Sequence, residues 1–395
     1  MSTRPIARSP DLSQLAKEGF QVSIRANYLM VRGIPYVTAR QQVAYGVLID
    51  DLDLAGDVTR QPKRHTIRFS GGYPCDERGY PIEGIRNNAE NLKIDEDVVA
   101  NYTFSAKPSS GKYTDYYQKI TTYAEIISAP ARCIDKNARA NGYQFIPSDS
   151  SNDSVFCYLD TASSRAEISQ ISKKLEYRKI VIIGMGGTGG YVLDQIAKTP
   201  VEEIHIYDSD EFLQHNAFRA PGAASCDELE SSPKKVDYFS KKYSLMHRGI
   251  IPHCKNIDES SISEILDADF VFICIDGGYR KRSIIANLAE KNINFIDVGL
   301  GLEIRNDCVA GILRVTASTQ KMRDHIERNE RISFSDADDD DEYDKNIQVA
   351  DLNALNAILA VVKWKKISGF YADTEMEHHI TYILDANELT NEDLP

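Results

Sequence analysis

The sequence lacks closely spaced cysteines, and this absence argues against two kinds of small scaffold. Seven cysteines are scattered along 395 residues, and none of them forms a C-x-x-C pair. Disulfide-rich folds and tetrahedral zinc sites need thiols at short spacings. We therefore expect reduced thiols and a cytoplasmic location.

Long apolar runs and blocks of basic residues are also missing. The longest apolar runs, such as Phe270–Ile275 and Ala357–Val362, are too short to span a bilayer, and the first twenty residues contain no continuous apolar stretch of the kind found in a secretory signal. The net charge is −13, without an extended Lys/Arg block. We therefore expect no membrane insertion and no nucleic-acid partner.

What the chain does contain is the composition of a globular protein, with 42% hydrophobic and 27% charged residues. Its length indicates two domains. Residues 1–10 are polar and predict a disordered start, and the breaker-rich stretch 147–154 predicts a linker. We expect a smaller α+β domain over residues 1–150, whose role the pattern does not assign, although it could recruit a substrate or partner. A second domain is expected over residues 155–395.

The second domain shows strands alternating with helices. The expected strands are Lys179–Ile183, Ile204–Asp208, Asp269–Ile275 and Asn294–Val298, with helical segments at Tyr191–Lys198, 233–246 and 280–291. This alternation predicts an α/β fold with a doubly wound, Rossmann-like parallel sheet.

A glycine-rich turn lies directly between the first of these strands and its helix. The glycines are Gly184, Gly186, Gly187, Gly189 and Gly190. Glycine permits a tight turn and close approach of a phosphate, while the helix N-terminus offers free N–H groups. Asp208 ends the next strand, where a carboxylate suits the hydroxyls of a ribose. These residues predict a nucleotide site but leave ATP and NAD open.

The residues that follow Asp208 favour ATP over NAD. They are Asn216, Arg219, the pair Lys234-Lys235 and Asp276. Attack on an α-phosphate needs cationic donors and a metal-binding carboxylate, whereas hydride transfer does not. Asp276 follows a strand and is therefore expected at the carboxyl edge of the sheet, where doubly wound folds bind ligands.

The ordered set GxGGxGG, DxD, NxxR, lysine and a strand ending in Asp resembles the ThiF/MoeB family of adenylyltransferases, which includes the ubiquitin-activating enzymes. The resemblance covers about residues 164–385. The segments His215–Ala223 and Asn346–Ala357 look like those of bacterial members encoded with ubiquitin-like proteins.

The resemblance implies a role for each matching residue. The phosphates would be lined by Gly184, Gly186, Gly187 and Gly189 and contacted by Asn216, Arg219 and Lys235. Asp208 would hold the ribose, and Asp276 would bind Mg²⁺. Arg219, Lys235 and Asp276 would act in catalysis. Relatives are homodimers in which an arginine reaches the ATP of the partner protomer, so Arg165 is either such a finger in trans or an ordinary exposed arginine.

The implied activity is ATP-dependent adenylation of the C-terminal carboxylate of a ubiquitin-like protein that ends in glycine. This step would begin a bacterial conjugation pathway with a conjugating-enzyme-like partner. Other readings are a sulfur-carrier-protein adenylyltransferase, a catalytically inactive nucleotide-binding scaffold and, least favoured, an NAD-dependent oxidoreductase.

The sequence departs from the family pattern in the loop expected to be mobile, residues 316–346. Many relatives carry a nucleophilic cysteine there, whereas this loop has none. Cys308 is the nearest thiol and a weak candidate. The adenylate would otherwise pass directly to an external acceptor or to a loop hydroxyl with His325 as base. The available hydroxyls are those of Thr316, Ser318, Thr319, Ser333 and Ser335.

The amino-terminal domain offers two further patterns. Cys75 follows His65 by ten positions, which fits a nucleophile with a histidine or, as we favour, a cysteine packed beneath the turn Gly71–Pro74. Tyrosines gather at 113–123, which suits either an interface or a core.

Overall fold

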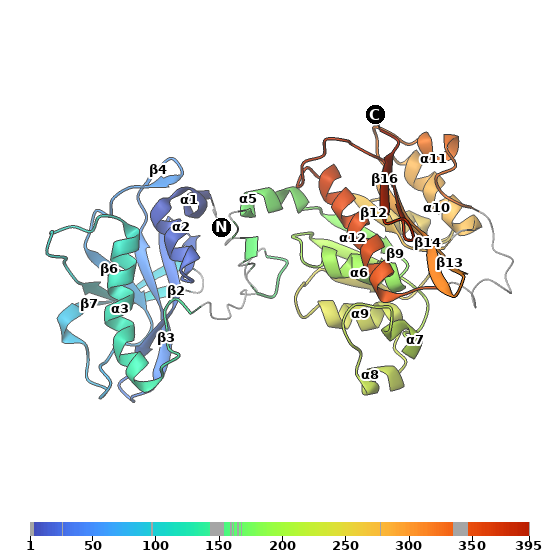
Figure 1. Ribbon diagram of the computed structural model, residues 1–395. Coiled ribbons are helices and arrows are strands. Elements are labelled where there is room, and N and C mark those ends of the chain that lie inside the picture. The colour runs from blue at the N-terminus through green and yellow to red at the C-terminus, as the bar shows by residue number, and fades with distance from the viewer. Residues whose placement is uncertain are drawn as a thin grey trace. The chain divides into compact units, whose positions relative to one another are not determined.

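The computed structural model describes residues 4–25, 27–95, 98–142, 154–158, 160, 162–163, 166, 168–276, 278–334 and 347–394. The chain divides into unit 1, Met1–Pro147 with Leu159–Gln170, and unit 2, Ser148–Tyr158 with Ile171–Pro395 (Figure 1). None of the described helices combines the length and the apolar character needed to cross a membrane.

Unit 1 is built on an antiparallel sheet of six strands in the order β1-β2-β3-β6-β8-β7. These strands are β1 Gln21–Arg25, β2 Tyr28–Val37, β3 Val43–Asp51, β6 Thr66–Ser70, β7 Arg86–Asp95 and β8 Val98–Ser105, and a small hairpin pairs β4 Leu54–Ala55 with β5 Val58–Thr59. Its helices are α1 Arg4–Arg8, α2 Pro10–Lys17 and α3 Tyr116–Ile134, with a 3-10 turn at Glu83–Ile85. Apolar side chains of α2 and α3 pack on one face of the sheet and form the core.

The expected disordered start was wrong for residues 4–10, and residues 1–3 lie outside the described residues. The chain is helical from Arg4, and Ser9 is fully buried, with its Oγ accepting a hydrogen bond from the Thr59 N–H at 3.0 Å. Leu12 and Leu15 of α2 anchor this segment because both side chains lie in the core.

The tyrosines near α3 are mainly core residues. Tyr113, Tyr116 and Tyr123 are almost fully buried, and their hydroxyls donate hydrogen bonds to main-chain carbonyls, as Tyr116 does to Asp51 at 2.7 Å. Burial raises the pKa of all three phenols. Their hydroxyls thus serve to join α3 and its flanking loop to the sheet.

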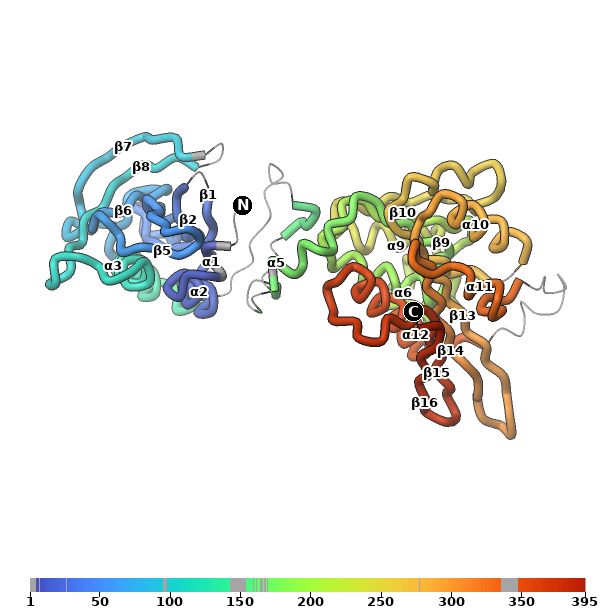
Figure 2. The backbone as a smooth tube through the Cα atoms, turned by 90° about the horizontal axis from the view of Figure 1, so that it is seen from above, coloured from blue at the N-terminus to red at the C-terminus, as the bar shows by residue number. Residues whose placement is uncertain are grey.

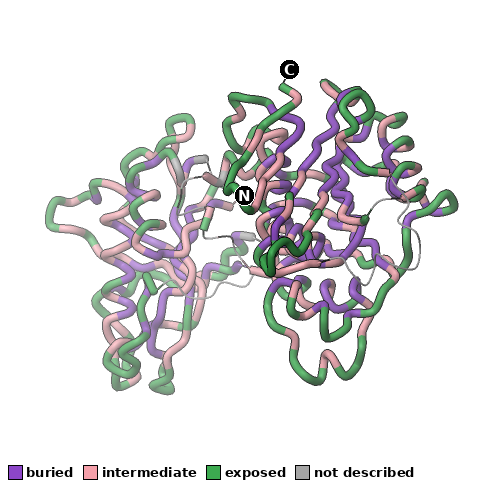
Figure 3. The backbone as a smooth tube through the Cα atoms, turned by 45° about the vertical axis from the view of Figure 1, so that its right-hand side comes forward, coloured by how far each residue is buried: buried purple, intermediate pink, exposed green. Residues whose placement is uncertain are grey.

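Unit 2 contains a sheet of eight strands in the order β11-β10-β9-β12-β13-β14-β15-β16. Its strands are β9 Lys179–Ile183, β10 Glu203–Tyr207, β11 Ile250–His253, β12 Phe270–Ile273, β13 Asn294–Arg305, β14 Cys308–Ser318, β15 His379–Ile383 and β16 Glu388–Glu392. The strands from β11 to β13 are parallel, and those from β13 to β16 pair antiparallel. Every residue of β9 is buried, as expected of a central strand covered on both faces. Buried residues are drawn in purple in Figure 3.

Helices cover both faces of this sheet, which confirms the predicted α/β fold (Figure 2). Apolar residues of α6 Gly187–Ile196, α9 Lys235–Tyr243 and α12 Ala350–Ile367 pack on one face. The other face is covered by α10 Tyr279–Glu290, α11 His325–Arg328 and the 3-10 turn Ile262–Ile265. The remaining short helices are α5 Ser169–Ser172, α7 Gln214–Ala217 and α8 Cys226–Glu230, with a 3-10 turn at Lys173–Leu175.

Several expected boundaries differ from the structure, and helix α6, for instance, begins at Gly187 and not at Tyr191. The strand predicted to end at Val298 continues as β13 to Arg305, because it pairs with β14 along a long antiparallel hairpin. The loop expected over residues 316–346 starts three residues later in the structure, since Thr316 and Ser318 belong to β14. Residues 335–346 of that loop lie outside the described residues.

His247 is a buried histidine whose neutral form is built into unit 2. Its Nδ1 accepts a hydrogen bond from the Gly249 N–H at 3.0 Å, so Nε2 carries the proton and donates to the Val201 carbonyl at 2.9 Å. Burial lowers the pKa of the ring to about 4, from an ordinary 6.5.

We expect this histidine to weaken the fold in acid. Between pH 6.5 and 4, His247 is protonated in the unfolded chain but stays neutral in the folded protein. Its contribution to the free energy of unfolding is therefore complete above pH 6.5 and is lost as the pH falls towards 4. The loss approaches about 3 kcal/mol. Denaturant unfolding at a series of pH values should give a shallower pH dependence for His247→Gln than for the natural protein. His65→Gln in unit 1 is the control, and parallel curves for His247→Gln and the natural protein would contradict the assignment.

Candidate functional site

The glycine loop follows β9, the strand at which the order of strands in the sheet reverses direction. β10 and β12 flank β9 on opposite sides, although β12 follows much later in the chain. The loop is held between them: the Gly184 N–H donates to the Tyr207 carbonyl at 2.8 Å, and the Cys274 N–H donates to the Ile183 carbonyl at 2.8 Å. Doubly wound sheets bind ligands at this position.

Four of the five glycines of the loop are closely packed, and one is not. A Cβ at Gly190 would lie 2.8 Å from Phe239 Cζ. A Cβ at Gly184 would lie 2.6 Å from the Cys274 carbonyl oxygen, one at Gly187 would lie 2.2 Å from Asn353 Nδ2, and one at Gly189 would lie 1.9 Å from the Gly184 oxygen. Gly184 also has a φ of +90°. A Cβ at Gly186 would meet nothing within 4 Å. The backbone at Gly186 is therefore open to a ligand.

Helix α6 begins immediately after this open position. Gly186 is its N-cap, and no described side chain caps the helix. The first N–H groups of a helix have no partner within the helix, and together with the helix dipole they attract an anion. The loop and α6 thus form a cradle suited to a phosphate.

The carboxylate of Asp208 supports this cradle from β10. Its Oδ2 accepts a hydrogen bond from the Met185 N–H at 2.7 Å, and its Oδ1 accepts one from the Asp210 N–H at 2.9 Å. Its exposed fraction is only 8%. The residue expected to hold a ribose therefore also fixes the shape of the loop.

Lys235 rather than Lys234 belongs to this cluster. Lys235 is buried, with Nζ 2.7 Å from Asp210 Oδ2 and 3.6 Å from Asp208 Oδ1. The Lys234 side chain is 40% exposed and its Nζ binds the Ser209 carbonyl. Asp210 is thus a support for Lys235, and the lysine can present positive charge next to the loop.

Asn216 and Arg219 come from the short segment around α7. Asn216 is buried, and its Oδ1 accepts a hydrogen bond from the Leu213 N–H at 2.8 Å. The Nε of Arg219 is buried without a hydrogen-bond acceptor among the described residues. The pKa of His215 is lowered by burial and further by the charges of Arg219 and Lys235. Two cations therefore gather here, and within the described residues Arg219 has no carboxylate partner.

Asp276 lies in the turn between β12 and α10, beyond the carboxyl end of β12. Its side chain is exposed. The described residues contain no cluster of three His, Cys, Asp or Glu side chains suited to a metal. A single accessible carboxylate matches the way Mg²⁺ binds, with one or two carboxylates and the rest of its ligands from phosphates and water.

The remaining candidates are less well placed. Arg165 lies outside the described residues. Cys308 is exposed and pairs with Arg305 at the tip of the β13–β14 hairpin. Since Asp297 of β13 aligns with Ile273 of β12, the tip lies about 25 Å farther along the strand.

Three of the five candidate hydroxyls are buried in the fold. Thr316, Ser318 and Thr319 are buried, with hydrogen bonds to Arg314, Arg323 and His378 respectively. His325 is completely buried, so it is not available to a substrate as a base. Ser333 is exposed, and Ser335 lies outside the described residues.

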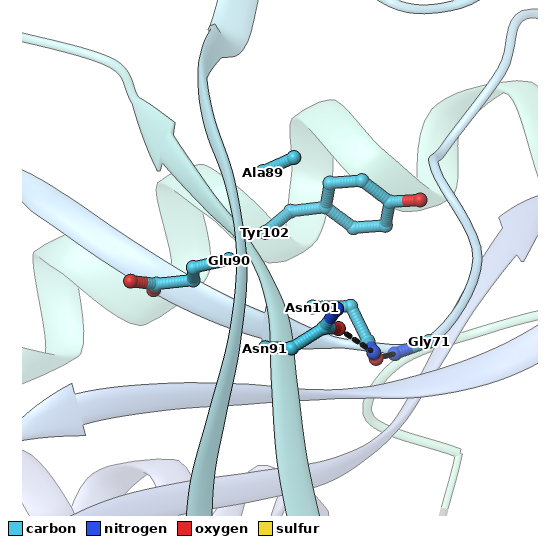
Figure 4. Close-up of a pocket in the computed structure, with 6 residues that line it drawn as sticks. All are labelled: Gly71, Ala89, Glu90, Asn91, Asn101 and Tyr102. Carbon is cyan, nitrogen blue, oxygen red and sulfur yellow. Dashed lines mark hydrogen bonds between the residues drawn. The ribbon is translucent and has the colours of Figure 1, made fainter.

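Unit 1 offers a shallow hollow of about 370 Å³ where β7 bulges against β8. Its polar groups largely bind one another: Asn101 Oδ1 accepts from the Gly71 N–H at 3.0 Å, and Asn101 Nδ2 reaches Asn91 Oδ1 at 3.4 Å. Figure 4 shows Glu90 pointing away from these asparagines. Cys75 is nearby in sequence but only 2% exposed, as expected of a packed thiol, and burial raises its pKa.

Sequence reasoning missed Asn353 of α12. It is fully buried, its Oδ1 accepts a hydrogen bond from Thr188 Oγ1 at 3.1 Å, and its Nδ2 lies against Gly187. Asparagine is a poor helix former, and Asn353 and Asn356 both stand on the buried side of this helix. Two asparagines at these positions of the helix are the sequence feature that could have indicated a polar contact.

Comparison with known families divides the chain in the same two parts. Residues 159–362 match the model of the ThiF family. Residues 10–161 match a domain of unknown function, DUF6791.

Individual relatives match about a third of the chain. Ubiquitin-like modifier-activating enzyme 5 of Drosophila grimshawi is 22% identical over 150 residues, covering 35% of this chain and 38% of the relative. The tRNA threonylcarbamoyladenosine dehydratase of Haemophilus influenzae is 28% identical over 134 residues, covering 32% and 49%. The chain thus spans less than half the length of these curated relatives.

Among solved structures, PaaA aligns with a TM-score of 0.48 and 16% identity, covering 70% of this chain and 95% of that one. E. coli MccB in complex with AMPCPP and MccA aligns with a TM-score of 0.44 and 16% identity, covering 71% and 83%.

We expect the packed and the open glycines to respond differently to a methyl group. Gly189→Ala should lower the free energy of unfolding by about 1–3 kcal/mol, because the new Cβ would strike the Gly184 oxygen. Gly186→Ala should change it by less than about 0.5 kcal/mol, because the space there is open. Denaturant unfolding measures both, and equal losses would show that Gly186 is packed as well.

Proposed function

Because this chain belongs to the ThiF family, we propose that it uses ATP to adenylate the C-terminal carboxylate of a ubiquitin-like protein that ends in glycine. The products are an acyl-adenylate and pyrophosphate. We place this step at the start of a bacterial conjugation pathway in the cytoplasm, with a conjugating-enzyme-like protein downstream.

One observation carries the proposal. The N-terminus of α6 has no side-chain cap, and the space next to Gly186 is open. Arg219, in the segment that follows α7, has no carboxylate partner among the described residues. Arg219 and Lys235 both act electrostatically on His215. The chain directly after Arg219 contacts α6, because Tyr191 Oη donates to the Ala220 carbonyl at 3.5 Å. A polyphosphate is the ligand that satisfies both the helix end and the guanidinium.

Each residue of the candidate site has a separate role in the proposed reaction. Gly186 and the first N–H groups of α6 hold the phosphates, and Asp208 orients the ribose. The substrate carboxylate is already ionised at neutral pH, so it attacks the α-phosphate without a general base. Arg219 and Lys235 stabilise the negative charge that develops on the phosphoryl oxygens, and Asn216 holds the segment that carries Arg219.

Asp276 is the residue that would hold Mg²⁺ at the opposite side of the loop. Its exposure beyond the end of β12 fits a metal that takes most of its ligands from the nucleotide and water. The ion would neutralise the leaving pyrophosphate. We further propose a homodimer in which Arg165 of one protomer reaches the ATP of the other.

The adenylate is proposed to pass directly to an external acceptor. The loop after β14 carries no cysteine, and the candidate hydroxyls of Thr316, Ser318 and Thr319, in β14 and directly after it, are buried in hydrogen bonds. Unit 1 is proposed to recruit the small protein or its next carrier.

The central test is the exchange of labelled pyrophosphate into ATP, dependent on a small protein ending in glycine. Arg219→Ala and Asp276→Ala should each slow this exchange by about 100-fold or more, because the first removes a cation from the reacting phosphates and the second removes the residue proposed to hold Mg²⁺. Lys241→Ala, which changes an exposed cation on α9, is the charge-matched control for Arg219→Ala and should retain the natural rate. Full exchange in both site variants would refute the assignment.

Gly186→Ala tests the open position separately from the cations. The added methyl group would occupy space proposed for a phosphate, so ATP affinity should fall about tenfold or more while stability is retained. Isothermal titration of ATP gives the affinity. Undiminished ATP affinity would place the phosphates elsewhere, and tight binding of NAD with none of ATP would favour an oxidoreductase.

A further inference from the structure

Three charged side chains form a buried triad beside the turn that carries Asp276. Lys281 Nζ lies 2.6 Å from Asp297 Oδ1, and Arg314 Nη2 lies 2.6 Å from Asp297 Oδ2. The exposed fractions of the Lys281 and Asp297 side chains are 4% and 0%, and that of Arg314 is 20%. One carboxylate thus serves two cations almost out of contact with water.

The triad joins three separate elements of unit 2. Lys281 stands in the first turn of α10, Asp297 in β13 and Arg314 in β14. Burying charges costs free energy, and well-packed apolar residues often stabilise a fold as well or better. A buried triad at this position therefore suggests a task other than stability.

Lys281 makes a second bond that points to this task. Its Nζ donates to the Ile275 carbonyl at 3.1 Å, directly before Asp276 in the chain. Gly278, with a φ of +104°, ends the turn and begins α10. The lysine therefore ties the main chain of this turn to Asp297 in the neighbouring strand.

The position of Arg314 is specified as well. It faces Gly299 across the β13–β14 ladder, and a Cβ at Gly299 would lie 2.7 Å from its Nη2. Its Nη1 donates to Thr316 Oγ1 at 2.8 Å. The guanidinium is thereby held over a glycine and directed at Asp297, which keeps that carboxylate in place for Lys281.

We propose that Lys281 is a positioning residue, which holds the Ile275–Asp276 turn so that the Asp276 carboxylate meets Mg²⁺ with the nucleotide, and that Asp297 and Arg314 hold Lys281 in turn. The importance of the turn rests on the proposed function of Asp276. The positioning itself is a property of this chain without any ligand.

The test compares Lys281→Met with Lys179→Met. Lys179 is an almost buried lysine at the opposite, amino-terminal end of the sheet, with Nζ 2.5 Å from Asp267 Oδ1 and 2.8 Å from the Glu264 carbonyl. It matches Lys281 in type, in its own burial and in binding one carboxylate and one carbonyl, although Asp267 is 59% exposed, and it lies away from the turn. Lys281→Met combined with Asp297→Asn removes one charge of each sign, so the net charge of the triad stays the same if the single variant does not fold.

The first readout is hydrogen exchange of the free protein over a peptide covering Cys274–Tyr279. Exchange there should rise about tenfold in Lys281→Met and in the double variant, and should stay unchanged in Lys179→Met. Equal exchange in the natural protein and both Lys281 variants would overturn the positioning role, whatever the protein's activity.

The second readout is titration of ATP with and without Mg²⁺. Both Lys281 variants should bind ATP alone with the affinity of the natural protein. The factor by which Mg²⁺ raises the affinity for ATP should be about tenfold smaller in these variants, as is usual when a residue that supports a metal ligand is removed. A natural Mg²⁺ increment in both variants would overturn the proposal. Absence of any such increment in the natural protein would instead count against Asp276 as a metal ligand.

Discussion

The carboxylate of Asp208 joins the glycine loop, the segment after β10 and helix α9 in the candidate site. It accepts the N–H of Met185 from the glycine loop and the N–H of Asp210 from the segment after β10, and it lies 3.6 Å from Lys235 of α9. Three stretches of chain thereby converge on two oxygens with little exposure to water. The bond to Met185 holds the loop between Gly184 and Gly187, two positions where the packing leaves no room for a Cβ.

Burial of charge alone does not identify a functional group in this protein. In unit 1, Lys119 and Asp50 form an ion pair of 2.6 Å that is as buried as the triad of unit 2, and burial raises the pKa of Asp50 to about 6. That pair joins α3 to β3 within the core. The triad differs because Lys281 also holds a main-chain carbonyl next to a site residue.

Much of the site could be predicted from the sequence because its signals are local. The glycine loop, Asp208, Arg219 and Lys235 lie in short segments whose spacing reflects strand, turn and helix, and the family and the α/β fold predicted from them are confirmed. The contacts that were missed depend on strand register and helix packing. Arg314 meets Asp297 across 17 positions, and nothing in the local pattern indicates that β13 continues past Val298 to bring them together. Sequence also left open which loop hydroxyls are buried, since this follows from the end of β14.

The contact between Asn353 and the glycine loop has a consequence for the order in which the site is completed during synthesis. Thr188 and Asn353 are 165 positions apart, and the strands β12 and β13 are translated between them. A nascent chain that has released the whole glycine motif therefore still lacks the side chain that packs against Gly187. The glycine motif is therefore complete on the ribosome long before its packing is, because the contact at Gly187 forms only when α12 packs on the sheet.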